Sequence, residues 1–313
     1  MPNVKDFYYD SSDKKNKIHA KIWEPDDTTE ILGILQIAHG MQEYIERYND
    51  FALFLAEKGY IVAANDHLGH GGSVGQGGQF GYFADKDGNQ CLIRDMYKLQ
   101  KLVKDEYPEV PYVLLGHSMG SFLARQYLCQ YGEGLDGAII SGTACHTKAE
   151  ADLGMTLCRV IAAFKGWHYC SKMVAGIAMG GYLKRIKNPR TVYDWLTRDE
   201  KIVDEYAAND ASGFDFTLNG YYNMFAGLKY LTVRRHLEKI PRDLPVLLIA
   251  GEEDPVGAYG SGPRKVAEEL KAIGIMDVEI ILYPDDRHEV LNELDRNKVW
   301  NDVLGWLKKK GDL

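Results

Sequence analysis

Short apolar runs alternate with amphipathic segments along most of the chain. The buried strands that these runs predict are Ile31–Ala38, Tyr60–Ala64, Tyr112–Leu115, Ala138–Ile140, Val246–Ala250 and Val278–Tyr283. Apolar residues at helical spacing predict helices over Arg47–Lys58, Gln90–Glu106, Ser121–Gln130, Pro263–Ile273 and Trp300–Leu307. A regular alternation of buried strands and helices favours an α/β fold with a parallel, doubly wound sheet.

Two further strands are expected near the N-terminus. Phe7–Tyr9 and Ile18–Trp23 alternate apolar and polar residues, and the polar segment Ser11–Asn16 between them supplies a turn. This antiparallel pair completes a mostly parallel, eight-stranded sheet with helices on both faces.

The alternation is interrupted in the second half of the chain. From about Cys145 to Arg235 no run predicts a buried strand, and amphipathic helical pieces such as Leu153–Phe164 appear instead. We interpret residues 145–235 as a helical cap inserted into a core of residues 1–144 and 236–313. A separate domain with its own core is the alternative.

Composition narrows the class of protein. The formal net charge of −8 over 313 residues, without a long basic run, argues against nucleic acid as a partner. Five scattered cysteines without C-x-x-C pairs indicate reduced thiols. We see no apolar signal-peptide core in Met1–Glu30 and no membrane span, so we expect a cytoplasmic protein.

The candidate nucleophile is Ser118, in the sequence Gly116-His117-Ser118-Met119-Gly120. This G-x-S-x-G pattern follows a predicted strand and precedes a predicted helix, the context that exposes a nucleophilic serine on a strained turn. Side chains at Gly116 and Gly120 would collide with the neighbouring strand and helix. The alternative is an ordinary turn whose serine caps the helix.

A serine nucleophile needs a base that a carboxylate orients. Asp254 and His288 follow the two last predicted strands, in the order serine, acid, histidine. We therefore expect Asp254 to hold His288, and His288 to accept the Ser118 proton. Glu252 and Glu253 compete with Asp254 for the acid role.

The transition state of acyl transfer also needs hydrogen-bond donors for its oxyanion. We expect the backbone N–H of Met119 to be one. The N–H of Met41 is our choice for the second, in the loop after Ile31–Ala38, where Gly40 permits the backbone turn.

Several segments together resemble the α/β-hydrolases that include monoacylglycerol lipases, bacterial lysophospholipases and serine aminopeptidase-like hydrolases. They are His39-Gly40-Met41-Gln42-Glu43 with Arg47-Tyr48, Asp66 to Ser73, and Gly116 to Gly120. The resemblance spans about residues 18 to 307. It implies the Ser118, Asp254, His288 triad, the Met41 and Met119 oxyanion hole, and a cap that admits a lipid-like acyl ester. Leu68 stands where many relatives have arginine.

The sequence contains no pattern typical of a metal site or a nucleotide-binding site. The histidines and acid at positions 39, 66, 67, 70 and 117 match no metal-binding spacing, so we expect no metal. The glycines from Gly69 to Gly81 form neither phosphate-binding pattern, so no cofactor is expected.

The leading hypothesis is a serine esterase that forms an acyl-enzyme, and the activities that we expect are those of a lysophospholipase or monoacylglycerol lipase. An alternative is an aminopeptidase or proline iminopeptidase-like enzyme whose substrate amine is held by cap acids; the available ones are Asp152, Asp194, Glu200 and Asp204. A third is a non-catalytic ligand-binding homologue. The sequence does not determine the oligomeric state.

Overall fold

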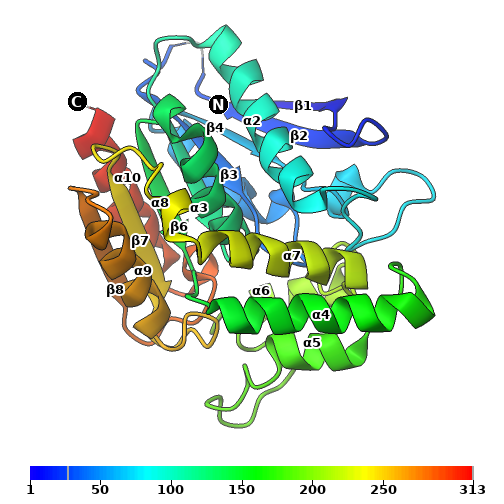
Figure 1. Ribbon diagram of the computed structural model, residues 1–313. Helices are drawn as coiled ribbons and strands as arrows, with labels where there is room; N and C mark the ends of the chain where they lie inside the picture. The colour runs from blue at the N-terminus through cyan, green and yellow to red at the C-terminus, as the bar shows by residue number, and fades with distance from the viewer. Residues whose placement is uncertain (27, 312–313) are drawn as a thin grey trace.

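The computed structural model describes residues 1–26 and 28–311. Its centre is one sheet of eight strands, in the order β1-β2-β4-β3-β5-β6-β7-β8 (Figure 1). The strands are β1 Asn3–Asp10, β2 Lys17–Glu24, β3 Gly33–Ala38, β4 Tyr60–Asn65, β5 Tyr112–His117, β6 Gly137–Ser141, β7 Val246–Gly251 and β8 Val278–Tyr283. Strand β2 is antiparallel to β1 and β4, and the other neighbours are parallel. The predicted α/β-hydrolase sheet is confirmed.

The helices cover both faces of the sheet. Helices α2 (Gly88–Glu106), α3 (Met119–Tyr131) and α9 (Ser261–Ala272) pack with one apolar cluster, and α1 (Asn49–Ala56) and α10 (Arg296–Gly311) pack with the other. Strands β3 to β7 are buried along their whole length. This double coverage explains why their sequences are nearly continuous apolar runs.

The segment between β6 and β7 contributes no strand to the sheet. Its helices are α4 Lys148–Lys165, α5 Lys172–Met179, α6 Glu200–Ala208, α7 Leu218–Leu231 and the short α8 Arg234–Leu237. Helices α4, α5 and α7 lie together beside one end of the sheet (Figure 1). The start of α4 is fixed by a capping box, because the side chains of Thr147 and Glu150 each accept a hydrogen bond from the other residue's backbone N–H.

Some predicted boundaries were wrong. The predicted strand Ile31–Ala38 begins only at Gly33, and the side chains of Ile31 and Leu32 are exposed. The predicted helix Arg47–Lys58 is a 3-10 turn, Ile45–Tyr48, followed by α1. Hydrophobic periodicity does not separate a 3-10 turn from the α-helix that continues it.

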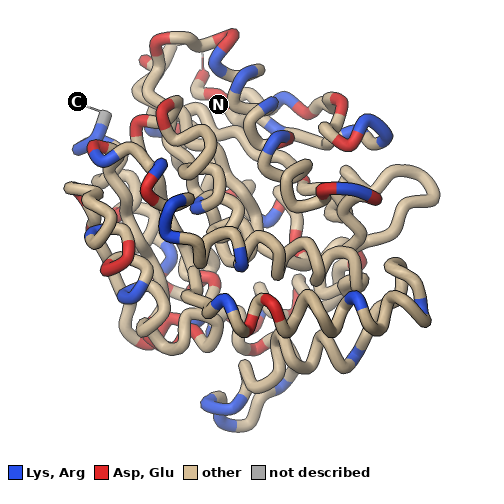
Figure 2. The backbone as a smooth tube through the Cα atoms, in the orientation of Figure 1, with Lys and Arg blue, Asp and Glu red and all other residues tan. Residues whose placement is uncertain are grey.

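Charges are distributed over the outer elements. In the view of Figure 2, basic and acidic residues are interspersed along the tube, and neither sign forms a continuous stripe. None of the described helices combines the length and apolarity needed to cross a bilayer.

Candidate active site

Ser118 lies on a sharp turn between β5 and α3. Its backbone has φ 53° and ψ −119°, outside the regions that non-glycine residues favour. Although it occupies the N-cap position of α3, its side chain makes no capping hydrogen bond. The hydroxyl is thus not used to cap the start of the helix, and Ser118 lines a cavity of about 320 Å³.

The glycines around the turn allow three backbone segments to approach closely. A Cβ added at Gly120 would overlap the carbonyl oxygen of Ala38 at the end of β3. One added at Gly116 would overlap the carbonyl oxygen of Gly120. Gly40 likewise faces the turn, since its added Cβ would lie 3.0 Å from Cβ of Ser118.

Asp254 and His288 follow β7 and β8, and the adjacent positions of these strands bring the two side chains together. Nδ1 of His288 lies 3.0 Å from Oδ1 of Asp254. That carboxylate oxygen also accepts the backbone N–H of Val256 at 2.8 Å. Both side chains are almost fully buried, which strengthens the electrostatic interaction between them.

Burial lowers the pKa of His288, but the carboxylates of Asp254, Glu289 and Glu43 together raise it by more, so the net shift is upward from 6.5. Among the described residues, no carboxylate is hydrogen-bonded to the neighbouring His117. Burial and the nearby His288 lower its pKa to about 4. Of the two histidines in contact, His288 is therefore the one suited to take up a proton.

The Nε2 atom of His288 is buried and has no hydrogen-bond partner among the described residues. No hydrogen bond joins it to the Ser118 hydroxyl, but both side chains lie close to His117. The rings of His288 and His117 are 4.7 Å apart, and a Cβ at Gly40 would meet both Ser118 and His117. Hydrogen bonds of this kind often tighten only when substrate binds.

The loop after β3 lies against Ser118. The left-handed backbone in this loop belongs to Gln42, with φ 61°, whereas Gly40 has no positive φ. The expectation that Gly40 makes the turn is therefore corrected. Glycine is needed at this position because a side chain would collide with Glu43 and Ser118. The amide of Met119 begins α3 and has no intrahelical acceptor, so it is free to serve another one.

A buried ion network, not foreseen from the sequence, ties this loop to the histidine loop. The Arg47 guanidinium binds Glu289 at 2.5 and 2.6 Å and Glu43 at 2.9 Å. Glu43 also accepts hydrogen bonds from the backbone N–H of Gly40 and from the Tyr48 hydroxyl. Glu289 directly follows His288, so the network joins the two loops on either side of Ser118.

Apolar side chains form most of the wall of the Ser118 cavity. They come chiefly from α4, α5 and α7, and include Leu153, Leu157, Ile177, Met179, Met224 and Phe225. Trp195 also lines the cavity, and its ring centre lies 5.2 Å from that of His288. The cavity therefore suits an apolar chain, with a polar end at Ser118.

Two groups of residues bear on metal binding, and the first is the histidines that follow β3 and β4. His39 holds its own loop, because its Nδ1 contacts the Gly40 carbonyl and its Nε2 accepts the His67 N–H. Burial lowers the pKa values of His67 and His70, which keeps both neutral.

Among the described residues, one set of carboxylates could share an ion, namely Asp286, Glu293 and Asp295. The guanidinium of Arg198 contacts all three and neutralises part of their charge. The set thus has a cationic partner within the chain.

Comparisons with known proteins identify relatives of this chain. The family model described as serine aminopeptidase, S33, matches residues 29–295. The monoacylglycerol lipase of Mycolicibacterium smegmatis is 27% identical, over 91% of each chain. Human monoglyceride lipase is 32% identical, over 94% of this chain and 87% of its own. A thermostable carboxyl esterase from Bacillus coagulans, solved with glycerol, superposes with a TM-score of 0.91 at 30% identity, covering 99% of this chain and 100% of its own.

Proposed function

Because this chain belongs to the serine aminopeptidase, S33, family of α/β-hydrolases and is a carboxylic-ester hydrolase, we propose that it cleaves lipid-like acyl esters through Ser118, Asp254 and His288. The preferred substrates are monoacylglycerols or lysophospholipids. The observation that carries the proposal is the apolar cavity that ends at the strained, uncapped Ser118. Each methylene of an acyl chain buried there contributes about 0.8 kcal/mol.

In the proposed mechanism, Nε2 of His288 accepts the hydroxyl proton of Ser118 while Oγ attacks the ester carbonyl. The backbone N–H groups of Met41 and Met119 stabilise the oxyanion. His288 then returns the proton to the leaving alcohol, and an acyl-enzyme remains. Water, activated by the same histidine, releases the carboxylate. Asp254 holds the imidazole in the tautomer that both steps require.

We further propose that residues 145–235 form the cap over this site. The proposal is supported by the origin of the cavity wall, which helices α4, α5 and α7 supply. Residues 1–144 and 236–313 would then form the core, which carries the proposed catalytic groups.

An aminopeptidase would need an acid near Ser118 to hold the substrate amine. The four cap acids considered for this role are engaged elsewhere and do not line the Ser118 cavity. Glu150 does line it, but its carboxylate accepts the backbone N–H and the hydroxyl of Thr147. Asp152 pairs with Lys148 and Lys229, Asp204 pairs with Arg190, and Asp194 accepts the backbone N–H groups of residues 190 and 191. Glu200 lies 3.6 Å from Arg190. These contacts favour an ester substrate over a peptide.

The proposal is tested by measuring hydrolysis rates with three kinds of substrate. They are a series of monoacylglycerols of increasing chain length, a lysophospholipid and an aminoacyl-naphthylamide. We expect the esters to be cleaved, with kcat/KM rising with chain length until the cavity is filled. Ser118→Ala should reduce ester turnover by about 10⁴-fold or more while the protein remains folded. Faster cleavage of the naphthylamide than of every ester would refute the ester assignment.

A further inference from the structure

A short segment of the proposed cap, residues 194–199, is hydrogen-bonded to the loop that carries His288. The backbone N–H of His288 donates to the Trp195 carbonyl at 3.4 Å, and the backbone N–H of Glu289 donates to the Leu196 carbonyl at 2.7 Å. The Trp195 ring also lies against the imidazole. The proposed mechanism assigns these contacts no role.

Arg198 supplies the charged part of this connection. Its guanidinium contacts the Asp286 carboxylate, two positions before His288, and its Nε donates to Glu293 at 3.0 Å. Its backbone N–H donates to Glu293 as well, also at 3.0 Å. Glu293 in turn accepts the backbone N–H of Arg287 at 2.9 Å. Arg198 is therefore connected to the chain on both sides of His288.

The charge of Arg198 is needed because its two main partners are buried. Asp286 and Glu293 are both 0% exposed, and no other cationic side chain in the described part of the chain pairs with either of them. Burial and the adjacent Glu293 carboxylate raise the pKa of Asp286 to about 7 even beside Arg198. Without the guanidinium, two buried carboxylates would repel each other and displace the loop between them.

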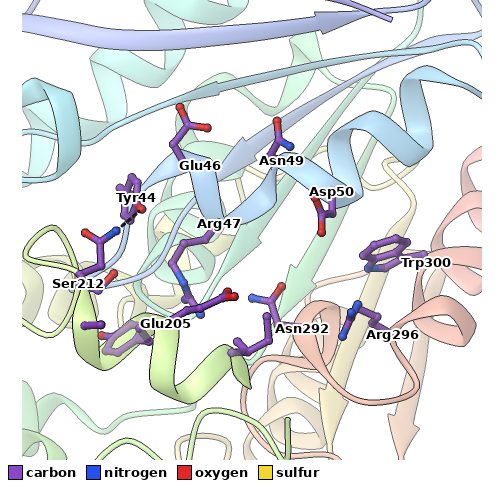
Figure 3. A pocket seen from close by; sticks show the side chains of 14 residues that line it. Tyr44, Glu46, Arg47, Asn49, Asp50, Glu205, Ser212, Asn292, Arg296 and Trp300 are labelled. Carbon is purple, nitrogen blue, oxygen red and sulfur yellow. Dashed lines mark hydrogen bonds between the residues drawn. The ribbon is translucent and has the colours of Figure 1, made fainter. Parts of the chain in front are cut away.

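The contact between the proposed cap and this loop is concentrated in the one segment. Within the described ranges, every hydrogen bond from the proposed cap to residues 286–296 comes from residues 194–199. Beyond the segment, α6 and the start of α10 line a cavity of about 580 Å³. Glu205, Asn292 and Arg296 are among the side chains around it (Figure 3). Few other contacts could therefore replace those of Arg198.

We propose that Arg198 is a positioning residue for His288, so that the cap segment belongs to the proposed active site as well as to its wall. Arg198 does not line the Ser118 cavity, and it acts by fixing the loop that directs the imidazole. The inference rests on the proposed role of His288 as the base. Displacing a catalytic group by about 1 Å can lower a rate by about 10²-fold.

Arg198→Ala and Arg198→Lys test the proposal with p-nitrophenyl acetate at about pH 8, where most Asp286 is ionised. The short acyl group makes little use of the apolar wall, so changes in acyl-chain binding do not contribute. We expect Arg198→Ala to lower kcat by about 10- to 100-fold with little change in KM. Arg198→Lys keeps the charge but not the planar fork, so its kcat should fall by only about two- to tenfold.

Guanidinium ion at millimolar concentration should restore part of the kcat of Arg198→Ala, because the Arg198 side chain is 28% exposed and its site is open to solvent. The matched control is Arg190→Ala, which removes a cap arginine whose ion pairs are with the exposed Glu200 and Asp204. Its kcat should equal that of the unaltered chain, with or without guanidinium.

Full kcat in a folded Arg198→Ala would overturn the proposal. A loss that neither lysine nor guanidinium relieves would also overturn it, because the loss would then reflect misfolding alone. Should Arg198→Ala not fold, full kcat in Arg198→Lys would overturn the proposal, and a lowered kcat at unchanged KM would support it. Turnover that survives in His288→Ala would instead refute the proposed function itself.

Discussion

The protonation of one residue, His288, governs the proposed chemistry. Nearby carboxylates, Asp254 first among them, raise its pKa above 6.5, and only the neutral imidazole can accept the Ser118 proton. Activity should therefore be lost as pH falls through that raised pKa, and be complete above it.

Replacing Asp254 by Asn tests this assignment. The amide no longer raises the pKa of His288, so the acid limb of the kcat/KM profile should move to lower pH. The plateau rate should also fall by about 10⁴-fold, because the imidazole loses its orientation. Profiles for a p-nitrophenyl ester between about pH 5 and about pH 9 provide the measurement. An unshifted limb with an undiminished plateau would show that Asp254 is not the acid.

Adding a single methyl group at Gly120 should lower the stability of the fold. Because it would overlap the Ala38 carbonyl oxygen, Gly120→Ala should destabilise the fold by about 1–3 kcal/mol and lower Tm. Gly305→Ala is the matched control, since nothing lies within 4 Å of its added Cβ in α10. That control should raise stability by about 0.5–1 kcal/mol. Equal melting temperatures for the two variants would contradict the close approach of β3 and α3.

Residue types and spacing indicated the side chains that we propose as catalytic, but not the side chains that hold them in place. Ser118, Asp254 and His288 each follow an apolar run, so their place at strand ends could be inferred. The partners of Arg47 could not, because Glu289 lies more than two hundred positions away. A buried ion network depends on tertiary contacts, which local patterns do not encode.

At the scale of elements, the segment around α6 contacts the loop after β3. The carbonyl oxygen of Gln42 accepts hydrogen bonds from the Tyr206 hydroxyl at 2.9 Å and from the Gly213 N–H at 3.0 Å. Gln42 directly follows Met41, a proposed oxyanion donor. We therefore expect Tyr206 to position that proposed donor.

Tyr206→Phe should reduce kcat by about two- to tenfold with little change in KM, because one hydrogen bond that orients the loop is lost. Steady-state kinetics with a p-nitrophenyl ester separate the two constants. Tyr8→Phe, which alters an exposed ring on β1, should leave both unchanged. If Tyr206→Phe changed only the melting temperature, the residue would be structural alone.

The central elements were easier to predict than the insertion. Strands covered on both faces have long apolar runs. In contrast, α5 and α6 are short, and their buried residues are Val174 in α5 and Val203 and Tyr206 in α6. Their helical pattern is correspondingly weak. The 3-10 turn before α1 was missed for a related reason, since its apolar residues continue the helical spacing.

At the scale of the molecule, strand order turns distant sequence positions into neighbours. The ends of β3, β5, β6, β7 and β8 lie along one edge of the sheet, and the proposed catalytic groups follow four of them. The long segment between β6 and β7 then supplies the apolar wall over that edge. The sheet follows from the sequence pattern, whereas the shape of the apolar cavity depends on how the insertion packs.

The most direct test of this account is the site and rate of labelling by a fluorophosphonate, followed by intact mass and peptide mapping. We predict one adduct per chain, located on Ser118, and strongly slowed labelling in His288→Ala. An adduct on another residue, or full ester turnover by a chain whose Ser118 is already blocked, would contradict it.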